Sequence, residues 1–70
     1  MTDKTRLAIA KKINDNRLKQ AKTQSDIAKK AGITSNYFAR IERGEVKPSM
    51  EIVLRIIKAL NVDAKDILGV

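Results

Sequence analysis

The sequence predicts an all-α protein, a compact bundle of five short helices in which the second and third helices form a helix-turn-helix. Apolar residues recur every three or four positions along most of the chain. Five segments carry signals for a helix start or stop. Two of these segments are joined at Gly32 by a very short turn, which is the spacing of a helix-turn-helix. A chain of 70 residues has no room for a second core, so residues 1–70 are expected to form a single domain.

The first helix is expected over residues 3–20, with lysines spread over its outer side. Its inner side is predicted from the apolar residues of this segment. These are Leu7, Ala10 and Ile13, with Ile9 as a further candidate, and then Leu18 and Ala21.

The second and third helices are expected to begin at residues 24 and 35. Thr23 followed by Asp26 is a variant of the capping box, and Thr34 is placed to cap the next helix. Gly32 and Gly44 suit the left-handed conformation that ends a helix. Small and apolar residues fall where two helices crossing at roughly a right angle would touch. These are Ile27, Ala28, Ala31, Ile33, Phe38 and Ile41.

A fourth helix is expected over residues 50–60 and a fifth over residues 64–68. Pro48 discourages continuation of the third helix, Ser49 caps the fourth, and Asn61 can end it. Asp63 and Asp66 repeat the capping pattern. The fourth helix has more apolar residues than one packed face needs. One side carries Met50, Val53, Leu54 and Ile57, while Ile52, Ile56 and Leu60 extend the apolar surface beyond it.

The composition indicates a polyanionic partner. The chain has 15 Lys and Arg against 8 Asp and Glu, a formal charge of +7. Cysteine and histidine are both absent, which removes disulfides, the usual zinc sites and the commonest general base. We therefore expect no enzyme, no metal and no cofactor. No apolar run approaches the roughly 20 residues of a membrane span, and no signal peptide is evident, so a cytoplasmic, nucleoid-associated protein is expected.

Seven short motifs share a characteristic spacing: Thr23-Gln24, Ile27-Ala28, Ala31-Gly32-Ile33, Tyr37-Phe38, Arg40-Ile41-Glu42-Arg43-Gly44, Pro48-Ser49 and Ala59-Leu60. With them, residues 13–68 resemble the lambda-repressor-like helix-turn-helix family, the phage repressor, Cro and XRE group. The resemblance implies a transcription regulator that binds double-stranded DNA, without a small-molecule ligand, through residues 35–43 in the major groove. Repression by excluding polymerase is the expected action, with activation as the alternative.

Carried over to this sequence, the resemblance assigns base contacts to Ser35, Asn36 and Arg40, with Ala39 as a further candidate for a thymine methyl. Asn36 can pair bidentately with adenine and Arg40 with guanine. Gln24 resembles the family glutamine that contacts phosphate. The weaker phosphate candidates are Tyr37, Arg43 and Lys47.

Arg17 and Glu42 occupy positions where some family members form an ion pair between the first helix and the end of the third. Such a pair would orient the reading helix. The residues leave two alternatives open: an exposed pair worth roughly 0–1 kcal/mol, or a partly buried clamp.

The surplus apolar surface of the fourth helix suggests a homodimer on a palindromic operator, with completion of a small monomer core as the alternative. The candidate dimer contacts are Ile52, Ile56, Ile67, Leu68 and Val70. A protein-interaction module, such as the antitoxin-like partner of another protein, is the second function hypothesis. RNA binding is disfavoured because the chain lacks an aromatic platform for stacking bases.

Overall fold

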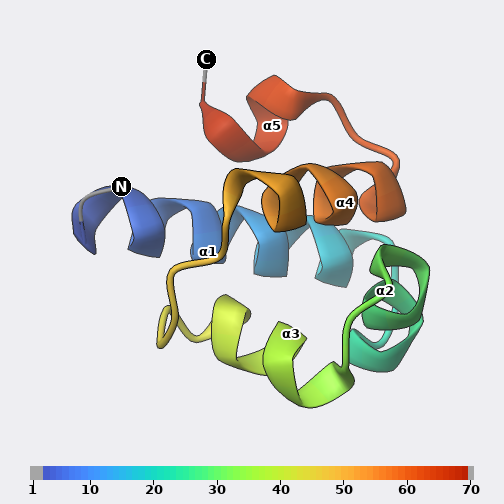
Figure 1. Ribbon diagram of the computed structural model, residues 1–70. Helices are drawn as coiled ribbons and strands as arrows, with labels where there is room; N and C mark the ends of the chain where they lie inside the picture. Colours follow the sequence, from blue (N-terminus) through green and yellow to red (C-terminus); the bar gives the residue numbers. More distant parts are fainter. Residues whose placement is uncertain (1–2, 70) are drawn as a thin grey trace.

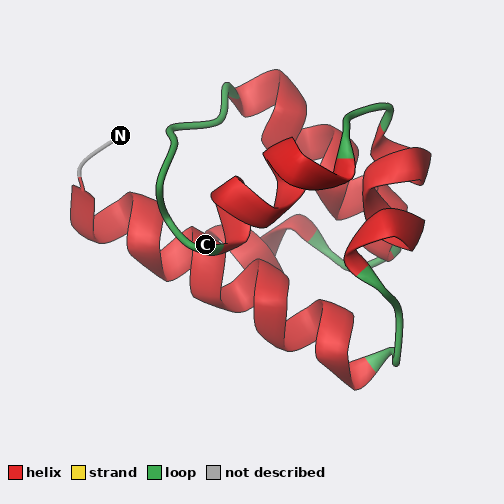
Figure 2. Ribbon diagram, turned by 90° about the horizontal axis from the view of Figure 1, so that it is seen from below, coloured by secondary structure: helices red, strands yellow, loops and turns green. Residues whose placement is uncertain are grey.

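The computed structural model describes residues 3–69, which contain five helices and no strand (Figures 1 and 2). The predicted fold class is therefore confirmed. The helices are α1 (Asp3–Lys19), α2 (Gln24–Ala31), α3 (Ser35–Glu42), α4 (Met50–Leu60) and α5 (Ala64–Leu68). Each boundary lies within one residue of the predicted one. Among the helices of residues 3–69, none is long and apolar enough to cross a membrane.

α1 and α4 lie alongside each other through the middle of the molecule, and the other helices pack around them (Figure 1). α3 lies below this pair in the view of Figure 1, and α5 lies above it. α2 packs against both α3 and α4 at one end of the bundle. This arrangement places α3 at the edge of the molecule, with one side on the core and the other facing solvent.

The predicted start signals are present as hydrogen bonds. Thr23 and Asp26 form the full capping box, with Thr23 Oγ1 accepting from the Asp26 N–H and Asp26 Oδ2 accepting from the Thr23 N–H, both at 3.0 Å. Thr34 Oγ1 accepts from the N–H of Tyr37 at 3.1 Å. Ser49 Oγ accepts from the fourth helix in the same way.

The predicted stop residues also adopt the conformation expected of them. Gly32 and Gly44 have φ of +74° and +72°, and Asn61 has +56°. Ala21 is left-handed as well, at φ +54°, and it follows the end of α1. The prediction that Ala21 continues the buried face of α1 is therefore wrong. An alanine in this region carries a steric cost of roughly 1–2 kcal/mol that a glycine would not.

The core is aliphatic around one aromatic ring. Its largest fully buried side chains come from all five helices: Phe38, Ile13, Ile27, Ile41, Ile56, Leu60, Ile67 and Val53. The buried positions of α1 are Ile9, Ala10 and Ile13.

The first helix buries a narrower apolar stripe than predicted. Leu7 is 52% exposed and Leu18 is 60% exposed, so their assignment to the core is wrong. At about 100° per residue, both lie roughly 120–140° around the helix from Ile13. Polar residues make the contacts near the end of α1 instead. Arg17 is half-buried, and the exposed Gln20, which follows α1, donates through Nε2 to the Leu60 carbonyl at the end of α4 at 2.6 Å.

The fourth helix faces the core with part of each of its two predicted apolar sets. Val53, Ile56, Ile57 and Leu60 are buried. Met50 and Leu54, expected on the same side as Val53, are instead 51% and 49% exposed. The reason is that α4 packs against α1, α2 and α5 at once, and the stripe they enclose runs through residues 53, 56, 57 and 60.

Candidate nucleic-acid interface

The outer side of α3 carries three polar side chains that residues 35–43 were predicted to offer to base edges. Ser35, Asn36 and Arg40 are exposed, while Phe38 and Ile41 on the other side of the helix are buried. The helix is therefore anchored by its apolar side and leaves its polar side free. The role of these three residues in base contact stays a prediction.

Ala39 is the fourth candidate on this helix. At about 100° per residue it lies within about 60° of Ser35 and Asn36, yet it is only 8% exposed. A contact between its methyl group and a thymine stays a prediction.

Arg17 and Glu42 form the clamp that the sequence left undecided. Arg17 Nε donates to Glu42 Oε2 at 2.7 Å and Arg17 Nη2 donates to Oε1 at 3.2 Å, a bidentate pair. The two side chains are only 11% and 3% exposed. Arg17 Nη1 also donates to the Lys22 carbonyl at 2.8 Å. The pair is the buried alternative rather than the exposed one.

Two amides that sequence reasoning did not connect with Glu42 complete its surroundings. Gln24 Nε2 donates to Glu42 Oε1 at 2.8 Å, and Asn14 Nδ2 donates to the same oxygen at 3.4 Å. We call these four residues, Asn14, Arg17, Gln24 and Glu42, the Glu42 cluster. It joins α1, the start of α2 and the end of α3. That the pair orients α3 stays a prediction. In the sequence, the contacts of Asn14 and Arg17 with Glu42 were indicated only by their spacing of three residues, which places both on the same side of α1.

Gln24 therefore has a partner within the protein as well as its predicted role at phosphate. Its amide nitrogen is directed at Glu42, and its residue is half-buried at the first position of α2. A phosphate contact by Gln24 stays a prediction. In the free protein its amide nitrogen links the start of α2 to the end of α3.

The remaining phosphate candidates lie near the C-terminal end of α3 or along it. Tyr37 is half-buried and packs against the core, while Arg43 and Lys47 are exposed. Arg43 donates through Nε to Glu45 in a short contact and through Nη2 to Glu45 Oε1 at 3.5 Å. Arg40 Nε also lies 3.8 Å from Glu45 Oε1.

Glu45 is thus part of this surface, although sequence reasoning assigned it no role. The hydrogen bond with Arg43 holds the pKa of Glu45 below its ordinary value and raises the pKa of Arg43. In the sequence, the location of Glu45 on this surface was indicated by its position directly after Gly44. A left-handed residue there turns the chain back toward the last turn of α3.

The predicted dimer contacts are separated by the structure. Ile56 and Ile67 are 0% and 1% exposed, and both belong to the core of one copy. They offer no surface to a second copy, so their assignment is corrected. Ile52 and Leu68 are half-buried and remain candidates. Val70 lies outside the described residues.

An apolar groove lies instead between the start of α4, the loop before it, α1 and α5. Ile9, Pro48, Met50 and Leu68 form its apolar lining, beside Thr5 and Lys47. Exposed Leu54 lies one helical turn beyond Met50 on α4. Met50 and Leu54 are exposed large apolar side chains beside this groove, whereas Ile9 and Pro48 in its lining are buried.

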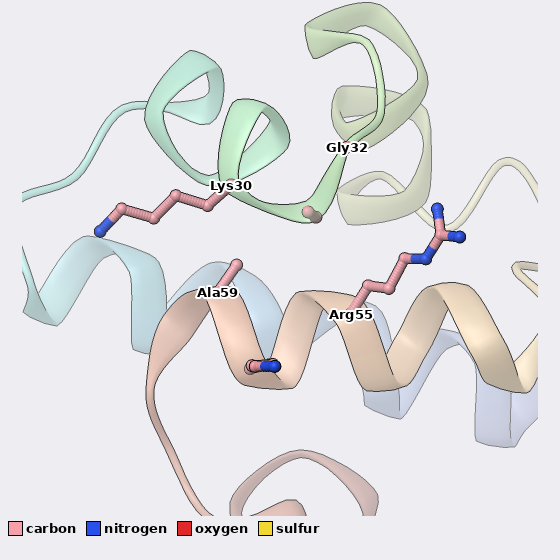
Figure 3. Close-up of a pocket in the computed structure, with 6 residues that line it drawn as sticks. Lys30, Gly32, Arg55 and Ala59 are labelled. Atoms are coloured by element: carbon pink, nitrogen blue, oxygen red, sulfur yellow. The ribbon is translucent and has the colours of Figure 1, made fainter.

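A second depression lies between the end of α2 and α4 and is bordered by cations (Figure 3). Lys30 and Arg55 point away from each other in Figure 3, and Arg55 is paired with Glu51 at 3.2 Å. Since the cations do not converge on one point, the depression does not have the geometry of an anion site.

The fold and the exposed side of α3 define a class of protein, a helix-turn-helix protein with its second motif helix free to enter a DNA groove. Comparison with known proteins agrees: residues 13–67 match the helix-turn-helix family, and the chain belongs to it, in the XRE and lambda-repressor-like group. It is accordingly a DNA-binding helix-turn-helix protein of the transcription-regulator type.

Two similar proteins illustrate this membership. The chain is 38% identical over 45 residues to an uncharacterized HTH-type transcriptional regulator of Methanocaldococcus jannaschii. The aligned region covers 64% of this chain and 68% of that protein. The crystal structure of the clp gene regulator ClgR from Corynebacterium glutamicum matches with a TM-score of 0.88 and 23% identity. That match covers 93% of this chain and 69% of the other, and it shows the shared fold.

Proposed function

We propose that the chain binds a palindromic operator in double-stranded DNA as a homodimer, with α3 in the major groove, and represses by excluding polymerase. Its place of action would be the nucleoid in the cytoplasm. The observation that carries this proposal is the exposed side of α3, held in place from behind by the Glu42 cluster.

The side chains on that surface have the chemistry for reading a mixed sequence. Arg40 can donate two hydrogen bonds to O6 and N7 of guanine, and Asn36 can pair with N6 and N7 of adenine. Ser35, at the first position of α3, can donate to or accept from several bases. The exposed basic residues Arg43 and Lys47, near the C-terminal end of α3, are the proposed phosphate contacts beside them.

A second copy of the chain is the proposed occupant of the apolar groove formed by Ile9, Pro48, Met50 and Leu68. The groove borders the loop that follows α3, through Lys47 and Pro48. In the proposed dimer the two copies of α3 would have to lie about one turn of DNA apart, roughly 34 Å.

Selection of binding sites from a random duplex library at two salt concentrations tests the proposal. Recovery of a palindrome with half-sites about 10 base pairs apart would support a dimeric operator-binding protein. Binding lost at higher salt without enrichment of any sequence would mean phosphate contacts alone. A monomer in solution that forms a stable complex with another protein would favour the antitoxin-like alternative.

Variants then separate base contacts from phosphate contacts. Arg40→Ala is expected to cost roughly 1–3 kcal/mol at one base pair and to relax specificity there. Lys47→Ala is expected to weaken binding to all sequences similarly. It is a cleaner phosphate variant than Gln24→Ala, because Gln24 also donates to Glu42. Equal losses on selected and random DNA for both variants would contradict the assignment of Arg40.

A further inference from the structure

We propose that Glu45 contributes to specificity by competing with DNA for Arg40 and Arg43, so that displacing its carboxylate is compensated best by DNA that offers the arginines better acceptors. This inference rests on the proposed function, in which α3 reads bases. It adds a negative residue to a surface for which only polar and basic residues were predicted.

The carboxylate of Glu45 lies between the two guanidinium groups. Its Oε1 is 3.8 Å from Arg40 Nε and 3.5 Å from Arg43 Nη2, and its Oε2 accepts from Arg43 Nε in a short contact. Both oxygens are therefore in use in the free protein. Arg43 donates to the carboxylate with the same fork that would contact phosphate, and Arg40 lies within ion-pair distance of it through the Nε that would also face DNA. Neither arginine can make its DNA contact fully while Glu45 holds it.

The backbone at the end of α3 determines where this carboxylate sits. Gly44, at φ +72°, donates to the Ile41 carbonyl at 3.0 Å, and the N–H of Glu45 donates to the Arg40 carbonyl at 2.9 Å. These two bonds form a Schellman motif. They turn the chain back over the last turn of α3 and attach Glu45 to the residue whose side chain it contacts. Its position is thus built by the helix end and does not depend on the rest of the loop.

Glu45 is also distinguished from the other acid of this region. In residues 35–47 the acidic residues are Glu42 and Glu45, and Glu42 is buried in its cluster with Arg17. Glu45 is exposed and lies beside Arg40, Arg43 and Lys47. It is therefore the negative charge on the side of this segment that would approach the phosphates.

The competition has different consequences on cognate and random DNA. On random DNA the arginines exchange a carboxylate for phosphates, and the freed carboxylate is left in the negative field of the backbone. At a guanine, Arg40 gains a bidentate acceptor in return, worth roughly tenfold or more in discrimination. The carboxylate can then accept from a cytosine amino group. Glu45 should therefore lower the affinity for random DNA more than the affinity for the cognate site, and so increase discrimination against the wrong DNA.

Glu45→Gln tests this, with Glu51→Gln as the matched control. Both substitutions remove one exposed negative charge, and Glu51 also pairs with an arginine, Arg55, at 3.2 Å. Glu51 lies on α4, outside the segment that carries Arg40 and Arg43. Binding would be measured by fluorescence anisotropy on a random duplex and on the duplex selected with the unaltered protein, at several salt concentrations.

Relative to Glu51→Gln, Glu45→Gln should tighten binding to the random duplex by about threefold to tenfold and steepen the slope of log K against log salt by about 1. Binding to the selected duplex should change by less than about twofold, so the ratio of specific to random binding falls. The thermal unfolding curves of the two variants should match, because glutamine leaves the backbone bonds of Glu45 intact.

Two results would overturn the inference. Equal effects of the two variants on the random duplex would mean that only net charge matters. Weaker binding of Glu45→Gln to both duplexes would mean that Glu45 positions the arginines and does not compete for them. In either case binding by the unaltered protein leaves the proposed function standing. A protein that binds no duplex at low salt would contradict the proposed function itself.

Discussion

Replacing Arg17 by methionine should destabilise the fold by about 3–5 kcal/mol, because it leaves Glu42 buried without its opposite charge. Glu42 is 3% exposed and would keep only the amides of Gln24 and Asn14, at 2.8 and 3.4 Å. Methionine retains an unbranched apolar stem, so the charge and its hydrogen bonds are the main loss. At roughly 0.05–0.15 kcal/mol per residue, a chain of this size has a total stability of about 4–10 kcal/mol. The substitution should remove a large part of it.

Urea unfolding followed by far-ultraviolet circular dichroism measures this loss. Lys11→Met is the matched control, because Lys11 pairs with Asp15 at 3.0 Å on the same helix but with side chains 77% and 47% exposed. Its loss should lie within roughly 1 kcal/mol. The double variant Arg17→Met with Glu42→Gln should lose less than the sum of its single changes, by about 1–3 kcal/mol.

The refuting result is an Arg17→Met variant no less stable than Lys11→Met, with additive effects in the double variant. The pair would then be hydrated in solution. Its role in orienting α3 would have to be given up, along with the explanation of how the reading surface is held.

Three further predictions concern single residues. Ala21→Gly should stabilise the protein by about 0.5–1 kcal/mol in the same urea assay, because it relieves a left-handed alanine, and no gain would contradict that conformation. Gly44→Ala and Gly32→Ala should each lower the midpoint of thermal unfolding, since both glycines have positive φ; the terminal methyl of exposed Leu7, which the added carbon would meet at Gly44, can turn away, and an unchanged midpoint for either variant would argue against its left-handed conformation. Asp26 has a pKa below its ordinary value of 3.8, chiefly through its bond from the Thr23 N–H. The Asp26 carboxylate therefore contributes fully to the free energy of unfolding above about pH 4, and this contribution is lost as pH falls through the lowered pKa of the folded state. Asp26→Asn should reduce the dependence of stability on pH below about pH 4. An unchanged pH dependence in that range would refute the prediction.

The helix boundaries could be predicted because their causes are local. A capping side chain reaches a backbone N–H three residues ahead, and a left-handed residue at a helix end bonds back to the same helix. Thr23, Thr34, Gly32 and Gly44 therefore did in the structure what their sequence positions indicated. Ala21 escaped notice because alanine is not a residue that suggests positive φ.

The direction in which each helix faces was predicted less well. Leu7 and Leu18 were expected on the inner side of the first helix because they are apolar, and Met50 and Leu54 were grouped with Val53 and Ile57 because they share their spacing. Helical periodicity identifies sets of residues that share a side, but on a helix as apolar as α4 several such sets exist. The neighbouring helices select among them.

By itself, the sequence determined the helix-turn-helix, the limits of its helices and the motifs that carry the family resemblance. The tertiary structure decided which residues reach one another across long separations. Glu42 and Arg17 are 25 positions apart, and the burial of their pair depends on how α1 and α3 pack. Glu45 lies beside Arg40 and Arg43 because the backbone turns back over the last turn of α3 at Gly44. Local hydrogen bonds are encoded within a few residues, whereas desolvation and long-range charge contacts exist only once the helices have packed.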